Sequence, residues 1–277
     1  MQIKQILKIS TEKLKNCVEN SNFEAEILLG YFLCKSREWL TAHDEDEVGD
    51  CEEFFGLVER RIGGEPLAYI LGYQEFFGRK FSVNPSVLIP RPETEIIIEE
   101  ALKFIHGKEK IIDVGTGSGA IGITIALEKP QTKVTLLEIS SEALVVARAN
   151  AENLKASVRF MQSADFFDQD LEQFEIILAN LPYIPTAEPQ IQKSVLDFEP
   201  HLALFGGEDG LDHYRNLFAR LSQAKFKPHV MICEIAYNQG KIFREIVQKF
   251  FPEAKLTIRT DHAGFDRTAI IVFNASV

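Results

Sequence analysis

The sequence predicts an α/β protein, in which a small helical domain and a β-hairpin linker precede a mostly parallel sheet. Apolar residues recur at helical spacing through the first 75 residues, whereas glycines and prolines interrupt the pattern over 76–92. From 93 to 277, short apolar runs alternate with helical segments, as in a parallel sheet with crossover helices. We therefore divide the chain into domains at 1–75 and 93–277, joined by the linker 76–92.

The N-terminal domain is expected to consist of helices. Apolar positions have helical spacing in each of three segments, 3–18, 25–33 and 54–62. Ser21 or Asn22 can cap the second of these helices. These patterns predict a small helical unit with its own apolar core.

Seven strands are expected in the second domain. The predicted strands are 110–114, 134–138, 158–161, 174–179, 229–234, 255–259 and 268–273, with helices at 120–129, 142–154, 211–221 and 241–251. Most of these strands are apolar throughout, so helices should cover both faces of the sheet. The last two strands are too close in sequence for a helical crossover, and we expect them to pair antiparallel at an edge.

Composition and charge narrow the class of protein. The chain has 277 residues, is 45% hydrophobic and carries a formal net charge of −11, so a basic face that grips nucleic acid is not expected. Four cysteines without a CxxC spacing or a partnered histidine predict small, buried, reduced thiols and no metal site. We find no signal sequence and no apolar run of about 18 residues, and so expect a soluble cytoplasmic protein without membrane association.

A glycine-rich segment, Asp113-Val-Gly-Thr-Gly-Ser-Gly-Ala-Ile-Gly122, ends the first strand of the sheet and opens a helix. Glycines let a backbone turn sharply beside a ligand, and a helix N-terminus presents free N–H groups. Glu138 ends the next strand, where its carboxylate can accept both hydroxyls of a ribose. The loop alone leaves two ligands open. It contains the dinucleotide pattern GxGxxG, whereas Asp-x-Gly-x-Gly-x-Gly resembles the S-adenosylmethionine (AdoMet) loop of class I methyltransferases.

The segment Asn180-Leu-Pro-Tyr183 follows the fourth strand, at the end of the sheet where ligands bind in open α/β folds. It resembles the Asn/Asp-Pro-Pro-Tyr signature of methyltransferases that act on planar nitrogen, either a side-chain amide or an exocyclic base amine. The Asn180 side-chain oxygen and the Pro182 carbonyl can accept the two N–H groups of such a nitrogen, and Tyr183 can pack on its flat face. A plain proline-rich turn would not explain the asparagine or the tyrosine.

With these motifs, the chain resembles the PrmC/HemK family, the protein-(glutamine-N5) methyltransferases of peptide chain release factors. The resemblance covers nearly the whole length. Besides the two motifs, it rests on the blocks 61–72, 77–78, 88–95, 199–211 and 234–240. Base methyltransferases share only the short glycine loop and the tetrapeptide.

The resemblance implies a Rossmann-like class I AdoMet-dependent methyltransferase fold with seven strands and an antiparallel edge strand, after an N-terminal domain that recognises the substrate. It implies methyl transfer from AdoMet to the glutamine amide nitrogen (N5) in the Gly-Gly-Gln motif of class 1 release factors, with S-adenosyl-L-homocysteine as product. The release factor would be the protein partner. We expect a monomer that forms no stable complex with nucleic acid.

Site residues follow from the resemblance by position. The catalytic residues would be Asn180, Pro182 and Tyr183, and the substrate-binding set adds Leu181. The cofactor-binding residues would be Gly115, Thr116, Gly117, Ser118, Gly119, Glu138, Asp165, Phe166 and Asn180. Arg91, with proline on either side, is open to two interpretations: it shapes the rim of the cofactor site, or it belongs to an interdomain spacer.

The sequence departs from the family pattern twice, and other functions are open. Glu138 stands where many members have Asp, and Leu181 replaces the first Pro of Asn-Pro-Pro-Tyr, which bears on the geometry of the substrate loop.

An N6-adenine DNA or RNA methyltransferase shares the tetrapeptide chemistry but calls for a basic groove. A NAD-dependent oxidoreductase or a non-catalytic nucleotide-binding protein leaves the tetrapeptide unexplained.

Overall fold

The computed structural model describes residues 1–163, 171, 173–187, 191–225 and 227–273. The chain divides into two compact units. One comprises Met1–Tyr73 and Ile191–Phe198, and the other comprises Gln74–Gln190 and Glu199–Val277.

The first unit is helical. Its helices are α1 (Ile3–Leu14), α2 (Ser21–Leu33), α3 (Arg37–Ala42), α4 (Glu52–Ile62), α5 (Leu67–Leu71) and α9 (Lys193–Phe198). The apolar faces of α1, α2 and α4 meet in one core, in which Ile6, Leu28 and Phe54 are fully buried. The expected helices of the N-terminal segment therefore form, and the short helices α3 and α5 are additional to those predicted. The predicted cap of the second helix is wrong, because its N-cap is Asn20, and Ser21 and Asn22 already lie in the helix.

The cysteines correct one expectation from the sequence. All four are free, and Cys51 and Cys233 are buried, but Cys17 and Cys34 are exposed. Cys17 follows the end of α1, and Cys34 caps the C-terminus of α2 in the left-handed conformation (φ 53°). The prediction of buried thiols is therefore wrong for these two, because both lie at helix ends rather than on an apolar face.

A hairpin forms as predicted, but at 73–82, so it begins before the predicted linker 76–92 and ends well before position 92. Strands β1 (Tyr73–Phe76) and β2 (Arg79–Ser82) make a two-stranded sheet. Both turn residues have positive φ, 49° at Phe77 and 71° at Gly78, which is the requirement of a two-residue type I′ turn. Glycine meets this requirement without strain, and the Phe77 backbone N–H is held by Glu95 Oε1 at 2.8 Å.

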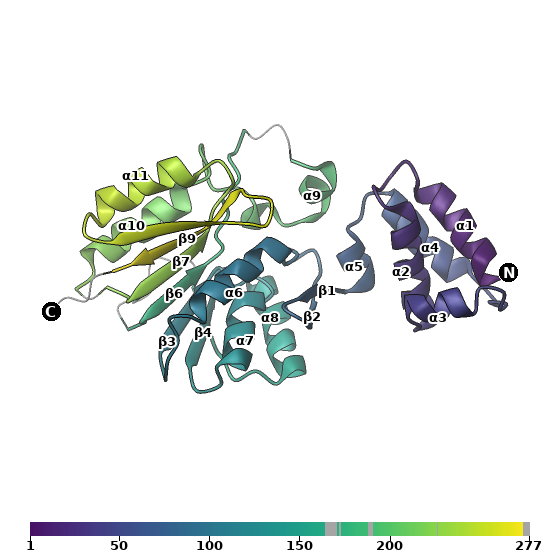
Figure 1. Cartoon of the computed structure of the whole chain (residues 1–277), viewed down its shortest axis with the longest axis horizontal. Helices are drawn as coiled ribbons and strands as arrows, with labels where there is room; N and C mark the ends of the chain where they lie inside the picture. The colour runs from purple at the N-terminus through teal and green to yellow at the C-terminus, as the bar shows by residue number, and fades with distance from the viewer. Residues whose placement is uncertain (164–170, 172, 188–190, 226, 274–277) are drawn as a thin grey trace. The chain divides into compact units, whose positions relative to one another are not determined.

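The second unit contains a seven-stranded sheet (Figure 1). Its strands are β3 (Lys110–Val114), β4 (Lys133–Glu138), β5 (Arg159–Gln162), β6 (Ile176–Ala179), β7 (Val230–Glu234), β8 (Lys255–Thr260) and β9 (Asp266–Val272), in the order β5-β4-β3-β6-β7-β9-β8. The first five strands pair in parallel, and β9 runs antiparallel to both β7 and β8. The predicted fold class, including the antiparallel pair at one edge, is confirmed.

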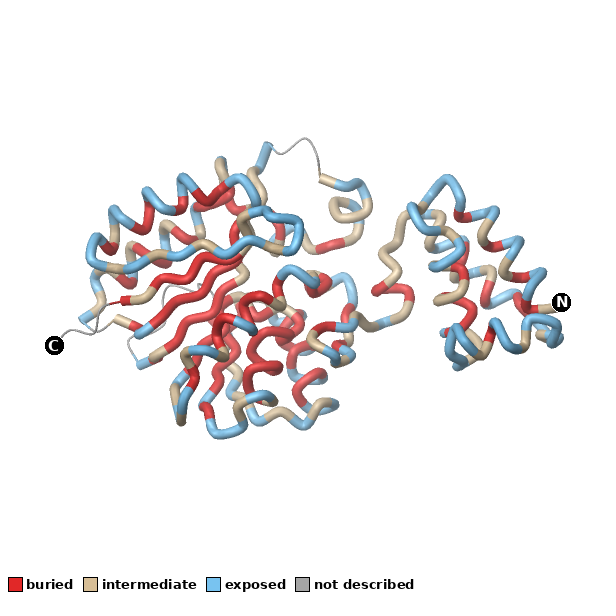
Figure 2. Tube along the Cα trace, viewed as in Figure 1, coloured by how far each residue is buried: buried red, intermediate tan, exposed pale blue. Residues whose placement is uncertain are grey.

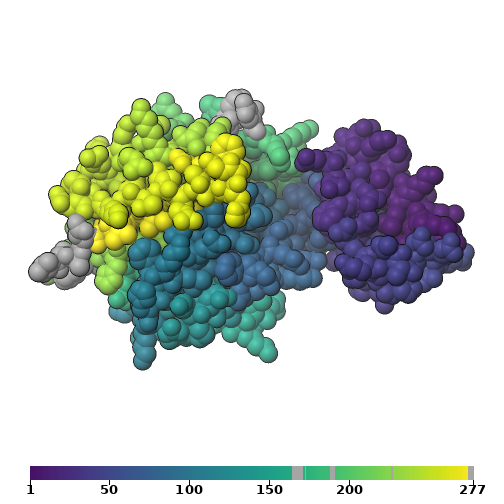
Figure 3. Space-filling model, in the orientation of Figure 1, coloured from purple at the N-terminus to yellow at the C-terminus, as the bar shows by residue number. Residues whose placement is uncertain are grey.

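Helices cover both faces of this sheet because alternate strand residues point to opposite sides. The helices are α6 (Glu95–Ala101), α7 (Ala120–Glu128), α8 (Ser141–Leu154), α10 (Asp212–Gln223) and α11 (Gly240–Phe250). Ile111 faces the core under α6, α7 and α8, whereas its neighbour Ile112 faces the core under α10 and α11. The strands β3, β4, β6, β7 and β9 are accordingly buried along most of their length, whereas the edge strands β5 and β8 contain no buried residue (Figure 2). Helix α11 lies beside β8 (Figure 3).

Candidate active site

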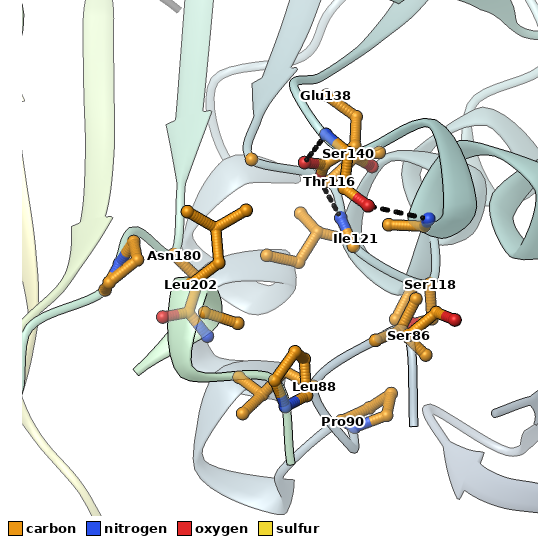
Figure 4. Close-up of a pocket in the computed structure, with 18 of the residues that line it drawn as sticks. Ser86, Leu88, Pro90, Thr116, Ser118, Ile121, Glu138, Ser140, Asn180 and Leu202 are labelled. Carbon is orange, nitrogen blue, oxygen red and sulfur yellow. Dashed lines mark hydrogen bonds between the residues drawn. The ribbon is translucent and has the colours of Figure 1, made fainter. Parts of the chain in front are cut away.

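A pocket of about 920 Å³, open to solvent, lies at the carboxyl ends of the parallel strands. Its walls come from segments that are distant in sequence. They are Ser86–Leu88, Pro90, Arg91 and Thr94; Gly115–Ser118, Ala120 and Ile121; Glu138–Ser140 and Ala143; Asn180 and Pro182; and Pro200, Leu202, Ala203 and His213. In Figure 4, Asn180 lies at one side of the pocket and Ser118 at the other.

The glycine loop forms one wall. It turns between β3 and α7 with positive φ at Gly115 (72°), Gly117 (54°) and Gly119 (84°), a conformation that residues with a Cβ rarely adopt. The Gly115 and Thr116 N–H groups both donate to the Leu137 carbonyl, at 2.9 and 3.1 Å. The loop is therefore tied to the neighbouring strand β4.

Asp113 holds the glycine loop in place through hydrogen bonds from one residue within the loop and one in the helix that follows it. Its Oδ2 accepts from Thr116 Oγ1 at 2.5 Å and from the Gly122 N–H at 3.0 Å, while Oδ1 is buried without a partner among the described residues. Burial raises the pKa of this carboxyl to about 6, against the lowering effect of the two hydrogen bonds. Asp113 is thus a structural brace and does not line the pocket.

Glu138 lies in the pocket wall with its carboxylate turned onto backbone donors. Oε2 accepts from the Gly117 N–H at 2.9 Å, and Oε1 accepts from the N–H groups of Ile139 and Ser140 at 2.8 and 3.0 Å (Figure 4). A carboxylate has about four acceptor positions and three are taken, so roughly one is left, fewer than the two that both hydroxyls of a ribose would need. The Glu138 carboxylate therefore links β4 to the glycine loop through the Gly117 N–H. It also keeps about one acceptor position for a ligand hydroxyl.

Asn180 begins the tetrapeptide where β6 ends. The last ladder pair between β3 and β6 is Val114↔Ala179, so Gly115 and Asn180 are the first residues beyond it on adjacent parallel strands. Asn180 Nδ2 donates to Thr94 Oγ1 at 3.3 Å. The motif that follows β3 and the motif that follows β6 therefore open into the same pocket.

The other tetrapeptide residues take different positions. Pro182 lines the pocket, and no described donor binds its carbonyl. Leu181 is 1% exposed and packs in the core under α10 and α11, so its side chain does not line the pocket. The Tyr183 hydroxyl donates to Glu234 Oε1 at 3.0 Å, and the Glu234 charge together with burial raises the pKa of the tyrosine. Tyr183 therefore stays neutral at physiological pH.

A loop of glycines clamps the tetrapeptide backbone. A Cβ at Gly206 would lie 2.3 Å from the Pro182 carbonyl oxygen, and one at Gly210 would lie 2.0 Å from the Tyr183 carbonyl oxygen. Gln239 Nε2 donates to the same Tyr183 carbonyl at 2.9 Å. Residues of the blocks 199–211 and 234–240 thus hold the position of the tetrapeptide.

Arg91 lies in the pocket wall and forms an ion pair with Glu199. Glu199 also accepts the Ile89 N–H at 3.1 Å. Its carboxylate therefore joins two residues of the block 88–95 to the block 199–211, whose glycines contact the tetrapeptide backbone. This position agrees with the interpretation that Arg91 shapes the rim. Its effect on ligand binding stays a prediction.

The structure brings most of the predicted site residues together. The pocket wall contains Gly115, Thr116, Gly117, Ser118, Glu138, Asn180 and Pro182, but not Gly119, Leu181 or Tyr183. Gly119 is the N-cap of α7. Asp165 and Phe166 lie outside the described residues. Contacts to the tetrapeptide from Thr94, Glu234 and Gln239 were not foreseen, because each joins residues at least 51 positions apart.

The described part of the chain contains neither a group of residues that could hold a metal ion nor a helix that could span a membrane. No group of three or more His, Cys, Asp or Glu side chains there could hold a metal ion. None of the described helices is long and apolar enough to cross a membrane.

Two solved structures with a similar fold are named as methyltransferases or belong to one. A methyltransferase from Pyrococcus furiosus aligns with a TM-score of 0.53 and 20% identity, over 72% of this chain and 91% of that one. The hMettl16 catalytic domain, in complex with MAT2A 3′UTR hairpin 1, aligns with a TM-score of 0.59 and 16% identity, over 76% of this chain and 80% of that one. These likenesses concern the fold alone.

Sequence relatives show the family. The PrmC N-terminal domain model matches residues 5–72, and the Methyltransferase small domain model matches 93–197. The release factor glutamine methyltransferase of Neisseria gonorrhoeae is 38% identical over 253 residues, covering 89% of this chain and 92% of that one. The Bacillus cereus enzyme of the same name is 35% identical over 277 residues, covering 96% and 98%. The resemblance drawn from the motifs is confirmed: the chain is a methyltransferase and belongs to the release factor glutamine methyltransferase family.

Proposed function

We propose that this protein transfers the methyl group of AdoMet to the side-chain amide nitrogen of the glutamine in the Gly-Gly-Gln motif of class 1 release factors. The observation that carries the proposal is one pocket lined by both motifs, the glycine loop with Glu138 and the tetrapeptide with Asn180 and Pro182. Family membership supports the same substrate class.

The residues present fit AdoMet. The glycine loop lets the backbone approach a ligand without a Cβ, and Glu138 keeps about one acceptor position for a ribose hydroxyl. We assign Gly115 to Gly119, Glu138 and Asn180 to the cofactor, with Asp165 and Phe166 near the adenine. When bound, AdoMet supplies a methyl carbon on a positively charged sulfur.

The tetrapeptide binds and orients the substrate amide nitrogen, which is a poor nucleophile. An amide nitrogen has its lone pair delocalised into the carbonyl, so it reacts only when it is held in a suitable orientation. We propose that Asn180 Oδ1 and the Pro182 carbonyl accept its two N–H groups, and that Tyr183 packs on the amide plane. Leu181 anchors the turn in the core. The nitrogen gains the methyl group and loses one proton, which passes to water.

The domain roles follow from this reaction. We propose that 1–75 recognises the release factor, that 76–92 is the linker and that 93–277 carries out methyl transfer. A monomer acting in the cytoplasm, where translation factors work, completes the proposal. The net charge of −11 argues against a stable complex with nucleic acid.

The test supplies the protein with AdoMet carrying an isotopically labelled methyl group and offers either recombinant class 1 release factor or duplex DNA with RNA hairpins. Mass spectrometry of peptides and nucleosides then locates the label. We expect the label on the glutamine of Gly-Gly-Gln, and its loss when that glutamine is replaced by alanine. Label on adenine and none on the release factor would overturn the proposal.

A further inference from the structure

Two buried side-chain amides, Gln239 and Asn150, bind the backbone of the two motifs that line the pocket. Gln239 is 4% exposed and is the N-cap of α11, and Asn150 is 1% exposed and lies in α8. Neither side chain belongs to the pocket wall. Each can therefore act on a ligand only through another residue.

Gln239 forms three hydrogen bonds to backbone groups. Its Oε1 accepts from the Ala236 N–H at 2.8 Å, and its Nε2 donates to the carbonyls of Tyr183 and Asp209 at 2.9 and 3.1 Å. A backbone N–H can only donate and a carbonyl can only accept, so these partners fix the orientation of the amide and use both of its N–H groups. Gln239 thereby joins the tetrapeptide to the 206–210 segment.

Asn150 has the same bonding pattern at the glycine loop. Its Oδ1 accepts from the Ser82 N–H at 2.7 Å, and its Nδ2 donates to the carbonyls of Ser82 and Ser118 at 3.0 and 2.9 Å. Ser82 ends β2, and Ser118 lies in the pocket wall. Asn150 thereby joins the hairpin to the glycine loop.

In the tetrapeptide, Gln239 fixes the peptide group that follows Tyr183. The Tyr183 carbonyl shares this planar group with the Ile184 N–H, which donates to the Leu204 carbonyl at 2.9 Å. Both polar ends of the group are therefore bound. Because the proline ring restricts φ at Pro182, a fixed Tyr183 backbone also sets the direction of the Pro182 carbonyl, the proposed acceptor for the substrate N–H.

In the glycine loop, Asn150 fixes the peptide group that follows Ser118. The Ser118 carbonyl shares this group with the Gly119 N–H, which donates to the Thr116 carbonyl at 2.8 Å. Both polar ends are again bound. Since Gly119 is the N-cap of α7, Asn150 also sets where the loop meets the helix.

We propose that Gln239 and Asn150 are positioning residues for separate halves of the pocket. Gln239 acts on the substrate half through the tetrapeptide, and Asn150 acts on the cofactor half through the glycine loop. The inference deepens the proposed function and rests on it, because that function assigns the first motif to the substrate glutamine and the second to AdoMet.

The acid of the same size tests each amide. An ionised carboxylate has no donor for the two carbonyls and repels both, and a protonated one has a donor for only one of them. Q239E should therefore displace the tetrapeptide, and N150D should displace the glycine loop. Each variant is the matched control for the other, because both place a carboxyl group against two backbone carbonyls.

The experiment uses the full-length protein and measures the Kd of AdoMet by calorimetric titration and kcat on release factor at saturating AdoMet. We expect Q239E to lower kcat about tenfold or more, the scale of unmade buried hydrogen bonds, with a smaller change in Kd. We expect N150D to raise the Kd about tenfold or more, with a smaller change in kcat.

Q239M and N150L remove the hydrogen bonds without adding a charge, and they decide the question if an acid variant fails to fold. Each should affect the same quantity as its acid counterpart, by a smaller factor. Urea unfolding reports the loss of stability, which we expect in both pairs. Equal changes in kcat and Kd within either pair would overturn the proposal, as would normal kcat in Q239M or a normal Kd in N150L.

NMR and the AdoMet titration separate this inference from the proposed function, because neither needs release factor. With ¹³C-carbonyl tyrosine, the Tyr183 resonance, assigned by its loss in Y183F, should shift in Q239M and stay in place in N150L. If the wild type methylates no release factor, the proposed function fails, whereas this shift and the Kd of N150L still test the two contacts. A Tyr183 resonance that Q239M leaves in place would contradict the proposed arrangement.

Discussion

Arg91 and Glu199, 108 positions apart in sequence, pair across the wall of the pocket. The Glu199 side chain is 1% exposed and that of Arg91 is 36% exposed, so the carboxylate depends on this cation for its charge partner. The pair joins the block 88–95 to the block 199–211, which contacts the tetrapeptide backbone. The linker is therefore part of the site at this point.

We expect R91A to weaken AdoMet binding several-fold and to lower the free energy of unfolding by about 1–3 kcal/mol, because it leaves Glu199 buried without its partner. Calorimetric titration and urea unfolding measure the two effects. R79A is a matched control, since Arg79 forms an ion pair with Glu128 outside the pocket wall. Unchanged affinity and turnover in R91A would favour the interpretation of this segment as a spacer.

Asn180→Ala removes the proposed acceptor for the substrate N–H. We expect kcat on release factor to fall on the order of a hundredfold, the scale for one hydrogen-bonding group that acts in the transition state. AdoMet binding, to which the glycine loop and Glu138 contribute as well as Asn180, should weaken less than kcat falls. Steady-state kinetics and titration with AdoMet give the two numbers. Turnover close to that of the wild type would remove Asn180 from its assigned role.

Gly206→Ala introduces a methyl group 2.3 Å from the Pro182 carbonyl oxygen. Either this carbonyl or the 206–210 segment must move, so we expect lower kcat and a loss of about 1–3 kcal/mol in the free energy of unfolding. Gly49→Ala is the control, because its added methyl group meets no described atom within 4 Å. Equal kinetics in the two variants would show that the Pro182 carbonyl needs no exact position.

Asp113 predicts a pH dependence of stability. Its pKa is about 6 in the folded protein against 3.8 for the free side chain, so the folded state binds more protons between these values. Stability from this residue is therefore present at low pH and is lost as pH rises through about 6, by on the order of 3 kcal/mol in total. The difference in unfolding free energy between wild type and D113N should fall between pH 4 and 7. A constant difference would contradict the raised pKa.

Local patterns predicted the parts of the structure that local physics determines. The glycine loop follows from the need for positive φ at Gly115 and Gly117, and the sheet strands follow from apolar runs such as 110–114. Helix α9 escaped prediction because it has no buried residue and hence no apolar stripe. Helix α6 escaped because Ile96, Ile97 and Ile98 are all buried, which gives a continuous apolar run without helical period.

The supporting contacts of the site could not be predicted from sequence for a different reason. Thr94 and Asn180 are 86 positions apart, and Gln239 and Tyr183 are 56 apart. No spacing rule links residues on separate strands until the order of those strands is known. The blocks that carry Glu199 and Glu234 were visible as part of the family resemblance, but their contacts depend on tertiary structure.

The register Val114↔Ala179 limits which parts of the site can change in sequence and length without loss of its geometry. Neighbouring strands are held about 4.8 Å apart by their backbone hydrogen bonds, whatever side chains they carry. The pairing of β3 with β6 therefore sets the distance between the loop that follows β3 and the tetrapeptide that follows β6. Loops around the pocket can lengthen, shorten or change partner without altering that spacing. A one-residue slip of β6 would destroy it, because every side chain of the strand would change face.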